Sequence, residues 1–282
     1  MPTTTALHPL FAARVAGIDI GQPVSAADAA WLRDALDRWS VLVFAAPSIT
    51  DDSQVAFSET FGTLETTRAG ANGAGGKLIV LTNIGSNGQI APPTDKQVLN
   101  NKANQIWHHD SSFKATPARA SLLSAREIPQ AGGDTEFAST RAAWQAMDPA
   151  RRQRVQDRMA VHDFGWSRAR VDPALMTAAE RDAHPPVRRA TVVAENPYGP
   201  ALYLGAHARS IDGIPEAEGR VLIDGLNDFA GSGDFVYRHH WTAGDLVLWD
   251  NRAVMHRATP FASGAERRHM VRTTVECPPT VR

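Results

Sequence analysis

The sequence predicts a mainly β protein with flanking helices, whose core is barrel-like or a jelly roll. Short apolar segments bounded by turn residues follow one another through the second half of the chain, between residues 190 and 276. They do not alternate with helices, which argues against a parallel sheet and favours antiparallel strands. Neither an internal repeat nor a polar linker divides the chain, so we expect residues 1–282 to form a single domain.

Two helices around one buried strand are expected near the start of the chain. Residues 25–40 place apolar side chains at helical spacing, with Ser25 and Asp28 arranged as a capping box. The apolar run 40–44 follows directly as a buried strand, and residues 50–62 predict a second helix. The front of the fold is therefore predicted to be helix, strand, helix.

The rest of the chain mixes loops with short elements. Residues 66–76, rich in glycine and alanine, predict a flexible loop, residues 87–104 could form an active-site lid, and residues 164–186 predict an irregular surface insertion. The expected strands cover residues 77–83, 118–128, 135–137, 190–196, 201–205, 235–241, 245–250, 253–258 and 268–276. The expected helices cover residues 139–147, capped by Ser139, and 214–230.

Composition limits the classes of partner. The 29 basic and 30 acidic residues give a net charge of -1, so there is no broad basic field to bind a nucleic acid backbone. No run approaches the roughly 18 apolar residues of a membrane-spanning helix, and the opening residues lack a secretory signal pattern. The one cysteine, Cys277, cannot form an internal disulfide. We expect a cytoplasmic protein that acts on a small molecule; a homo-oligomer is possible.

The segment WHHDSSF, residues 107–113, holds the first part of a candidate metal site. On an extended strand His108 and Asp110 point to one side, because they are two residues apart, and His109 points to the other. A distant histidine, His256, follows a strand and a DN turn that fix its imidazole. Two histidines and one carboxylate indicate the facial triad that binds ferrous iron and leaves positions open for a cosubstrate and dioxygen. A zinc hydrolase or a non-catalytic metal-binding protein could use similar ligands.

A candidate carboxylate site lies near the end of the chain. Arg268 and Arg272 are four residues apart on an expected strand and so point to one side of it. A buried arginine can bind the remote carboxylate of a 2-oxo acid with both prongs of its planar fork. Thr135, in the segment GGDTEF, offers a hydroxyl that could share that carboxylate.

With these segments in view, the chain resembles the Fe(II)/2-oxoglutarate-dependent dioxygenases of the taurine dioxygenase type, and among them the 2,4-dichlorophenoxyacetate (aryloxyalkanoate) dioxygenases. The resemblance covers nearly the whole chain and implies a double-stranded β-helix, or jelly roll, decorated by helices. The segments that carry it are LHPLFAA (7–13), SVLVF (40–44), FGTLE (61–65), ANQIWHHDSSF (103–113), GGDTEF (132–137), LGAHARSIDGIP (204–215), FVYRH (235–239) and GDLVLWDNRAVMHR (244–257), followed by the arginine pair.

The resemblance implies a role for each matching residue and a small anionic substrate that is hydroxylated as 2-oxoglutarate and O2 become succinate and CO2. The implied catalytic metal ligands are His108, Asp110 and His256; Thr135 and Arg268 would hold the distal carboxylate of 2-oxoglutarate, Trp249 would line its pocket, and Arg272 would meet the substrate anion. Gln89 and His207 are further substrate candidates. Halogenation is disfavoured, since halogenating relatives lack the carboxylate of Asp110.

Departures from the pattern leave the substrate open. Gln89 stands where the herbicide dioxygenases have a lysine, Glu195 stands near the place of an expected histidine, and the shorter loop after FGTLE offers glycines and Arg68. An aryloxyalkanoate-like carboxylate, possibly cleaved at its ether bond, is the leading substrate class. A taurine or alkylsulfonate dioxygenase, or an oxidative cyclase or desaturase on the same centre, is the alternative within the fold.

Overall fold

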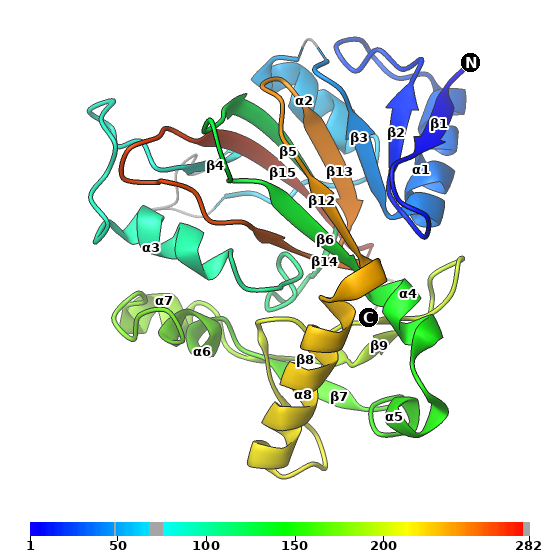
Figure 1. Cartoon of the computed structure of the whole chain (residues 1–282), viewed down its shortest axis with the longest axis vertical. Coiled ribbons are helices and arrows are strands. Elements are labelled where there is room, and N and C mark those ends of the chain that lie inside the picture. Colours follow the sequence, from blue (N-terminus) through cyan, green and yellow to red (C-terminus); the bar gives the residue numbers. More distant parts are fainter. Residues whose placement is uncertain (48, 68–75, 279–282) are drawn as a thin grey trace.

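The largest sheet of the computed structural model has seven strands and fills the upper half of Figure 1. The structure describes residues 1–47, 49–67 and 76–278. The strand order is β1 (Thr3–Ala6), β2 (Ala13–Ala16), β3 (Val41–Phe44), β13 (Leu246–Asp250), β5 (Ala118–Glu127), β15 (His269–Glu276) and β4 (Ile79–Thr82). Neighbours pair antiparallel except β2 and β3, which are parallel. Strand β13 is buried along its whole length, so it forms a rigid centre.

A three-stranded sheet faces the large one. Its order is β12 (Val236–His239), β6 (Thr135–Ser139) and β14 (Val254–Ala258). The apolar layer between the two sheets includes Phe137 of β6, Val254 of β14 and Trp249 of β13. Two antiparallel sheets packed over one apolar layer form the jelly-roll core expected from the sequence.

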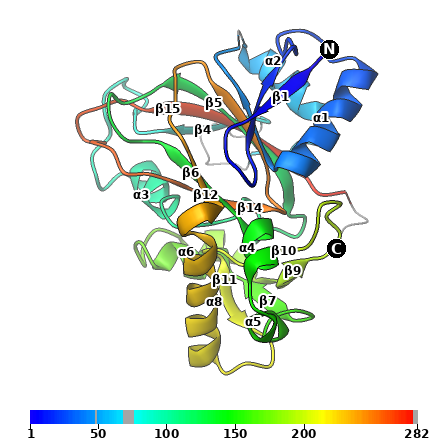
Figure 2. The ribbon, with the colours of Figure 1, turned by 45° about the vertical axis from the view of Figure 1, so that its right-hand side comes forward.

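Two helices cover the outer face of the large sheet, as Figure 2 shows. They are α1 (Ala26–Trp39) and α2 (Asp51–Glu59). Leu32 and Leu36 of α1 and Phe57 of α2 pack in one cluster with Leu122 and Leu248 of the sheet. Burying each of these large side chains stabilises the fold by about 1.5–3 kcal/mol, which fixes β13 and β5 from behind.

The remaining elements gather in the lower half of Figure 1. Its small sheets are β11 (Ala208–Ile211), β7 (Met159–His162) and β8 (Val187–Ala190), and β10 (Ala201–Leu202) and β9 (Val192–Val193). The helices are α3 (Lys96–Ala103), α4 (Thr140–Ala146), α5 (Pro149–Gln153), α6 (Phe164–Ala169), α7 (Ala178–Asp182) and α8 (Glu216–Ala230), with a 3-10 turn at Gly233–Phe235. Helix α8 packs Ile223 and Leu226 against Leu204 and Ile211. None of the helices described here is long and apolar enough to cross a membrane.

Most predicted elements are confirmed. The four expected helices are present as α1, α2, α4 and α8. The expected strands at 77–83, 118–128, 135–137, 235–241, 245–250, 253–258 and 268–276 are present as β4, β5, β6, β12, β13, β14 and β15. The strand expected at 201–205 is reduced to the two residues of β10.

Two parts of the chain differ from expectation. The predicted order helix, strand, helix is present as α1, β3 and α2, but a hairpin of β1 and β2 that was not predicted precedes it. Residues 190–196 do not form one strand, since the backbone N–H of Thr191 turns to the carbonyl of Arg158 and separates β8 from β9.

Two segments expected to be irregular contain helices. Residues 87–104 include α3 and residues 164–186 include α6 and α7. Each of these helices starts at a capping side chain, namely Asp95, Asp163 or Thr177, so the missed signals were local. The loop predicted at residues 66–76, with Arg68, lies largely outside the described residues.

A buried histidine of β7 makes stability depend on pH. His162 is fully buried and pairs its Nδ1 with Ser112 Oγ at 3.0 Å. Burial, with smaller effects of His109 and Arg189, lowers the pKa of His162 to about 3. In the unfolded chain this histidine is protonated below about pH 6.5, whereas in the folded chain it stays neutral until about pH 3. Its contribution to the unfolding free energy is therefore fully present above about pH 6.5 and is lost as the pH falls toward about 3.

We predict that His162→Gln will flatten the dependence of stability on pH. Between pH 7 and pH 5 the wild-type chain should lose about 2 kcal/mol more of its unfolding free energy than the variant does, because one proton uptake is removed. Urea unfolding at the two pH values measures this difference. Equal losses in both proteins would contradict the prediction.

Candidate active site

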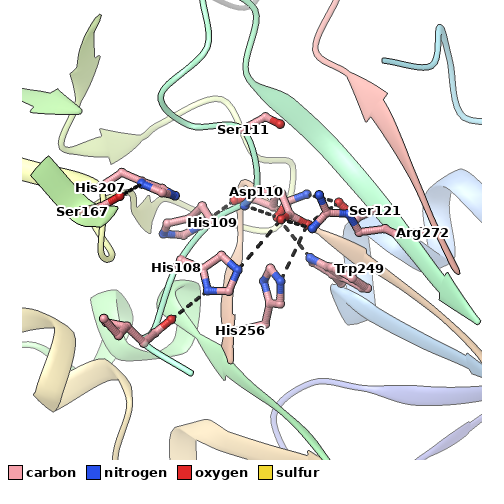
Figure 3. Close-up of polar contacts among 12 residues, drawn as sticks. His108, His109, Asp110, Ser111, Ser121, Ser167, His207, Trp249, His256 and Arg272 are labelled. Carbon is pink, nitrogen blue, oxygen red and sulfur yellow. Dashed lines mark hydrogen bonds and ion pairs between the residues drawn. The ribbon is translucent and has the colours of Figure 1, made fainter. Parts of the chain in front are cut away.

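Three buried side chains converge where a loop crosses β14. His108 and His256 form an isolated antiparallel bridge, in which each backbone N–H donates to the other carbonyl at 3.1 and 2.9 Å. Their rings lie 4.2 Å apart between centroids. Asp110 turns back toward both, with Oδ1 4.0 Å from His108 Nε2 and Oδ2 3.7 Å from His256 Nε2 (Figure 3). One ligand atom from each residue lies within 4.8 Å of the others.

The local backbone differs from the predicted strand. Only His108 makes a strand-like bridge, and the chain then turns at Asp110–Ser112, with Ser111 at φ +50°. Gly205 permits this turn, because a Cβ there would lie 3.1 Å from the Cα of His108 and its own φ is +68°. The two predicted ligands still face one way, while His109 pairs its Nδ1 with the carbonyl of Asn251 at 2.8 Å and lies outside the cluster.

Asp110 is held by a network that the sequence did not reveal. Its Oδ2 accepts from Ser121 Oγ at 2.7 Å, and its backbone N–H donates to Asn251 Oδ1 at 3.0 Å. The same amide of Asn251 donates to Ser121 Oγ at 2.9 Å and accepts from Trp249 Nε1 at 3.1 Å. Arg272 Nη1 donates to Asp110 Oδ1. The DN turn of the hairpin was the available signal for Asn251.

The charges of the cluster suit a divalent cation. Burial by itself would raise the pKa of Asp110, but Arg272, the two histidines and the Ser121 hydroxyl bring it well below its usual range. Burial lowers the pKa values of His108 and His256. Near neutral pH the cluster therefore offers one carboxylate and two neutral imidazoles, which is the state that metals bind. His108 Nδ1 pairs with the carbonyl of Ile106 at 2.8 Å, which directs Nε2 inward.

A narrow cavity of about 60 Å³ opens on one side of the cluster. Thr135, Trp249, Arg268 and Arg272 line it together with His108 and His256. The structure thus brings together all three residues predicted to bind 2-oxoglutarate. Arg268 lies just before β15 and not on it, yet its side chain reaches the same cavity as that of Arg272.

Arg268 and Thr135 in the narrow cavity have hydrogen-bond donors that could bind a carboxylate. Arg268 Nε donates to the carbonyl of Gly133 at 3.2 Å, and no carboxylate of the described residues forms an ion pair with it. Burial lowers the pKa of Arg268 to about 10, with Asp134 opposing, so the guanidinium stays charged. Thr135 Oγ1 accepts from Trp241 Nε1 at 3.0 Å, which leaves its hydroxyl proton available to a ligand. Trp241 was not predicted.

A second, wider cavity of about 700 Å³ opens on the other side, between α3 and the segment of α6 and α7. His108, Asp110 and Arg272 form its floor, and His207 lines it with its Nδ1 paired to Ser167 Oγ at 2.9 Å (Figure 3). Further lining side chains are Phe113, Lys114, Phe164, Arg168 and His184. The stretch 164–186, expected to be a surface insertion, is therefore a wall of this cavity.

Two residues singled out by departures from the family pattern lie elsewhere. Gln89 is exposed in the turn after β4, where its carbonyl accepts from the N–H of Gly85, and it lines neither cavity. Glu195 is likewise exposed and lies outside both cavities. A departure from the family's residue at a loop position does not indicate which way the side chain faces.

Comparisons with known proteins agree with this geometry. The family described as "Taurine catabolism dioxygenase TauD, TfdA family" matches residues 3–274. The alpha-ketoglutarate-dependent 2,4-dichlorophenoxyacetate dioxygenase of Cupriavidus pinatubonensis is 38% identical over 276 residues, which cover 96% of each chain. The (S)-phenoxypropionate/alpha-ketoglutarate-dioxygenase of Delftia acidovorans is 32% identical and covers 84% of this chain and 81% of its own. The structure of AAD-2 in complex with Mn(II) and N-oxalylglycine matches with a TM-score of 0.91 at 35% identity, covering 100% of this chain and 99% of AAD-2.

The predicted resemblance, jelly-roll fold and enzyme class are confirmed by these matches. Alpha-ketoglutarate is 2-oxoglutarate, and the family implies Fe(II), this cosubstrate and O2, in accord with the His-Asp-His cluster. The zinc hydrolase and the non-catalytic metal-binding protein are not favoured. The chain belongs to the TauD/TfdA family of Fe(II)- and alpha-ketoglutarate-dependent dioxygenases.

Proposed function

We propose that this dioxygenase hydroxylates a small aryloxyalkanoate carboxylate. The observation that carries the proposal is that two cavities meet at the cluster. The narrow one is lined by His108, His256 and the half-buried Arg268, and the wide one by His108 and Asp110 with aromatic and basic walls. The names of the relatives support the substrate class, since 2,4-dichlorophenoxyacetate and phenoxypropionate are both aryloxyalkanoates.

In this proposal His108, Asp110 and His256 hold Fe(II). The donor set fits, because two neutral imidazoles and one ionised carboxylate are the ligands of the facial triad. Bound iron supplies the activation of O2, by which 2-oxoglutarate loses CO2 to give succinate and the second oxygen atom enters a substrate C–H bond. Ser121 and Asn251 keep the carboxylate of Asp110 turned toward the two imidazoles.

Arg268 and Thr135 bind the distal carboxylate of 2-oxoglutarate, and Trp249 forms the wall of its pocket. The charged guanidinium of Arg268 and the free hydroxyl proton of Thr135 line the same narrow cavity as His108 and His256. A ligand with a carboxylate at each end therefore fits, and its orientation is fixed because only one end offers a metal.

Arg272 was expected to meet the substrate anion, and it lines both cavities. It is engaged with Asp110, so we assign it first to the orientation of that carboxylate. Its Nε is buried without a hydrogen-bond partner among the described residues, which leaves one donor for a bound ligand.

Hydroxylation at a carbon that bears the ether oxygen gives a hemiacetal. The hemiacetal collapses by transfer of its hydroxyl proton to the departing aryloxy oxygen, so the products are a phenol and a 2-oxo acid. The net reaction is ether cleavage, with succinate and CO2 formed from the cosubstrate.

We further propose that residues 1–282 are one domain and that the enzyme acts in the cytoplasm. The lack of a second cysteine supports the proposed location.

The proposal predicts which compounds release succinate. With Fe(II), 2-oxoglutarate and O2, aryloxyacetates and aryloxypropionates should stimulate succinate formation and release the corresponding phenol, and taurine should not. Assays of succinate and phenol across this panel measure both products. Succinate release with taurine alone, or with no member of the panel, would refute the proposed substrate class.

Asp110→Ala should abolish turnover because it removes the only carboxylate of the proposed triad. Binding of Mn(II), followed by calorimetry, should weaken by more than about 100-fold, beyond the loss typical of a supporting residue. Asp228→Ala, at an exposed carboxylate on α8, is the matched control and should bind metal like the wild type. Retained turnover in the Asp110 variant would remove that residue from the triad.

Asn251→Ala should act through Asp110 and not through the substrate. We expect Mn(II) affinity to fall by about 10–100-fold, as is common when a residue that orients a ligand is lost, with KM for the substrate nearly unchanged. Asn87→Ala, in an exposed turn, serves as control. If metal affinity is unaltered while only the unfolding free energy drops, the role of Asn251 is structural.

A further inference from the structure

The wide cavity contains one cation whose charge is not matched. The lysines and arginines that line it, among the described residues, are Lys96, Lys114, Arg168 and Arg272. Lys96 pairs with Glu180 at 2.5 Å, Lys114 pairs with Glu65 at 2.5 Å, and Arg272 pairs with Asp110. No carboxylate of the described residues forms an ion pair with Arg168, and its Nε is buried without a hydrogen-bond partner.

Helix α6 holds Arg168 at the cavity wall. The helix starts at Asp163, whose carboxylate accepts from the N–H of Trp166 at 2.9 Å. The guanidinium of Arg168 lies over the ring of Phe164, 4.5 Å from its centroid. Burial lowers the pKa of Arg168 to about 10, with Arg272 adding to the shift and Asp110 opposing it. Arg168 is therefore charged at neutral pH and lies within electrostatic reach of the proposed metal ligand.

The ring of Phe164 beneath this cation belongs to a cluster of aromatic side chains. Phe113 and Phe164 stack with centroids 4.1 Å apart, and His207 contacts Phe113 at 4.7 Å and Phe164 at 5.8 Å. His184 adds an edge contact to Phe113 at 5.4 Å. Burial, followed by the nearby Arg168, lowers the pKa of His207 well below its usual value, so this ring is neutral. The wall beside Arg168 is thus aromatic, with Phe113 and Phe164 stacked and the histidine rings set at an angle to them.

The distance to the proposed metal is short on this side. The ring of His207 lies 6.4 Å from that of His108, between centroids, and both line the wide cavity. In a ligand with its carboxylate at Arg168 and its ring on the aromatic wall, the atoms between the two share one cavity with His108 and Asp110. Those atoms are the ones that an aryloxyalkanoate dioxygenase must oxidise.

We propose that Arg168 binds the carboxylate of an aryl-substituted substrate, whose ring packs against Phe113, Phe164 and His207. This assignment rests on the proposed function and replaces Arg272 as the first contact of the substrate anion. A guanidinium fork matches a carboxylate with two hydrogen bonds, and a flat ring gains most from an aromatic wall. An alkylsulfonate could pair with the charge of Arg168, but it has no ring to pack against the aromatic wall.

A binding experiment tests the proposal without turnover. The enzyme is loaded with Mn(II) and N-oxalylglycine, and calorimetry measures the Kd of phenoxyacetate and of its neutral analogue phenoxyacetamide. Arg168→Gln should weaken phenoxyacetate binding by about 10–100-fold, because a charge-assisted pair is lost. Binding of phenoxyacetamide should change less than about 3-fold. Arg168→Lys, which keeps the charge without the fork, should give an intermediate Kd.

Controls separate the possible failures. Arg170→Gln, at an exposed residue two positions on, should leave both Kd values unchanged, and N-oxalylglycine binding reports an intact narrow cavity in every variant. If wild-type enzyme binds phenoxyacetate and Arg168→Gln binds it equally well, the assignment of Arg168 is overturned while the proposed function stands. Equal losses for acid and amide would also overturn it. If the wild type binds taurine and no aryloxyalkanoate, both the substrate class and this assignment fail.

Discussion

The site depends on one small interaction, the backbone bridge between His108 and His256. Two hydrogen bonds join a loop after α3 to β14, although the two histidines are far apart in the sequence. The bridge sets both imidazoles side by side, and the turn that follows returns Asp110 to face them. Because backbone pairing joins the two histidines and the side chains of Ser121 and Asn251 hold Asp110, the fold itself organises the cluster.

The hairpin of β13 and β14 connects this cluster to the narrow cavity, the proposed cosubstrate pocket. Asn251, in its turn, contacts the N–H of Asp110, the hydroxyl of Ser121 and the indole of Trp249. Trp249 belongs both to the apolar layer between the sheets and to the wall of the narrow cavity. Packing of the jelly-roll core therefore positions both the proposed metal ligands and the Trp249 wall of the narrow cavity. A change in core packing would displace both.

The parts of the site that follow strand geometry could be predicted from the sequence. His256, Arg268 and Thr135 each lie on a strand or within one residue of its end, where the alternation of side chains decides which way they face. The wide cavity could not be predicted, because α6 and α7 are short helices whose contacts are tertiary. Arg168 looks like any other arginine in an Arg- and Pro-rich stretch, and only the folded chain shows that no carboxylate of the described residues pairs with it. The position of Gln89 could not be predicted either, because the sequence does not show that its turn faces solvent.

The balance of charge explains why both ligands should be anions. Arg168, Arg268 and Arg272 line the two cavities beside the cluster, and among the described residues Asp110 is the only carboxylate that pairs with any of them. Burial lowers the pKa of Arg168, and the charge of Arg272 lowers it further. A divalent metal would add further positive charge beside these arginines. A dianionic cosubstrate at Arg268 and a carboxylate at Arg168 neutralise most of that excess, so each anion favours the binding of the groups beside it.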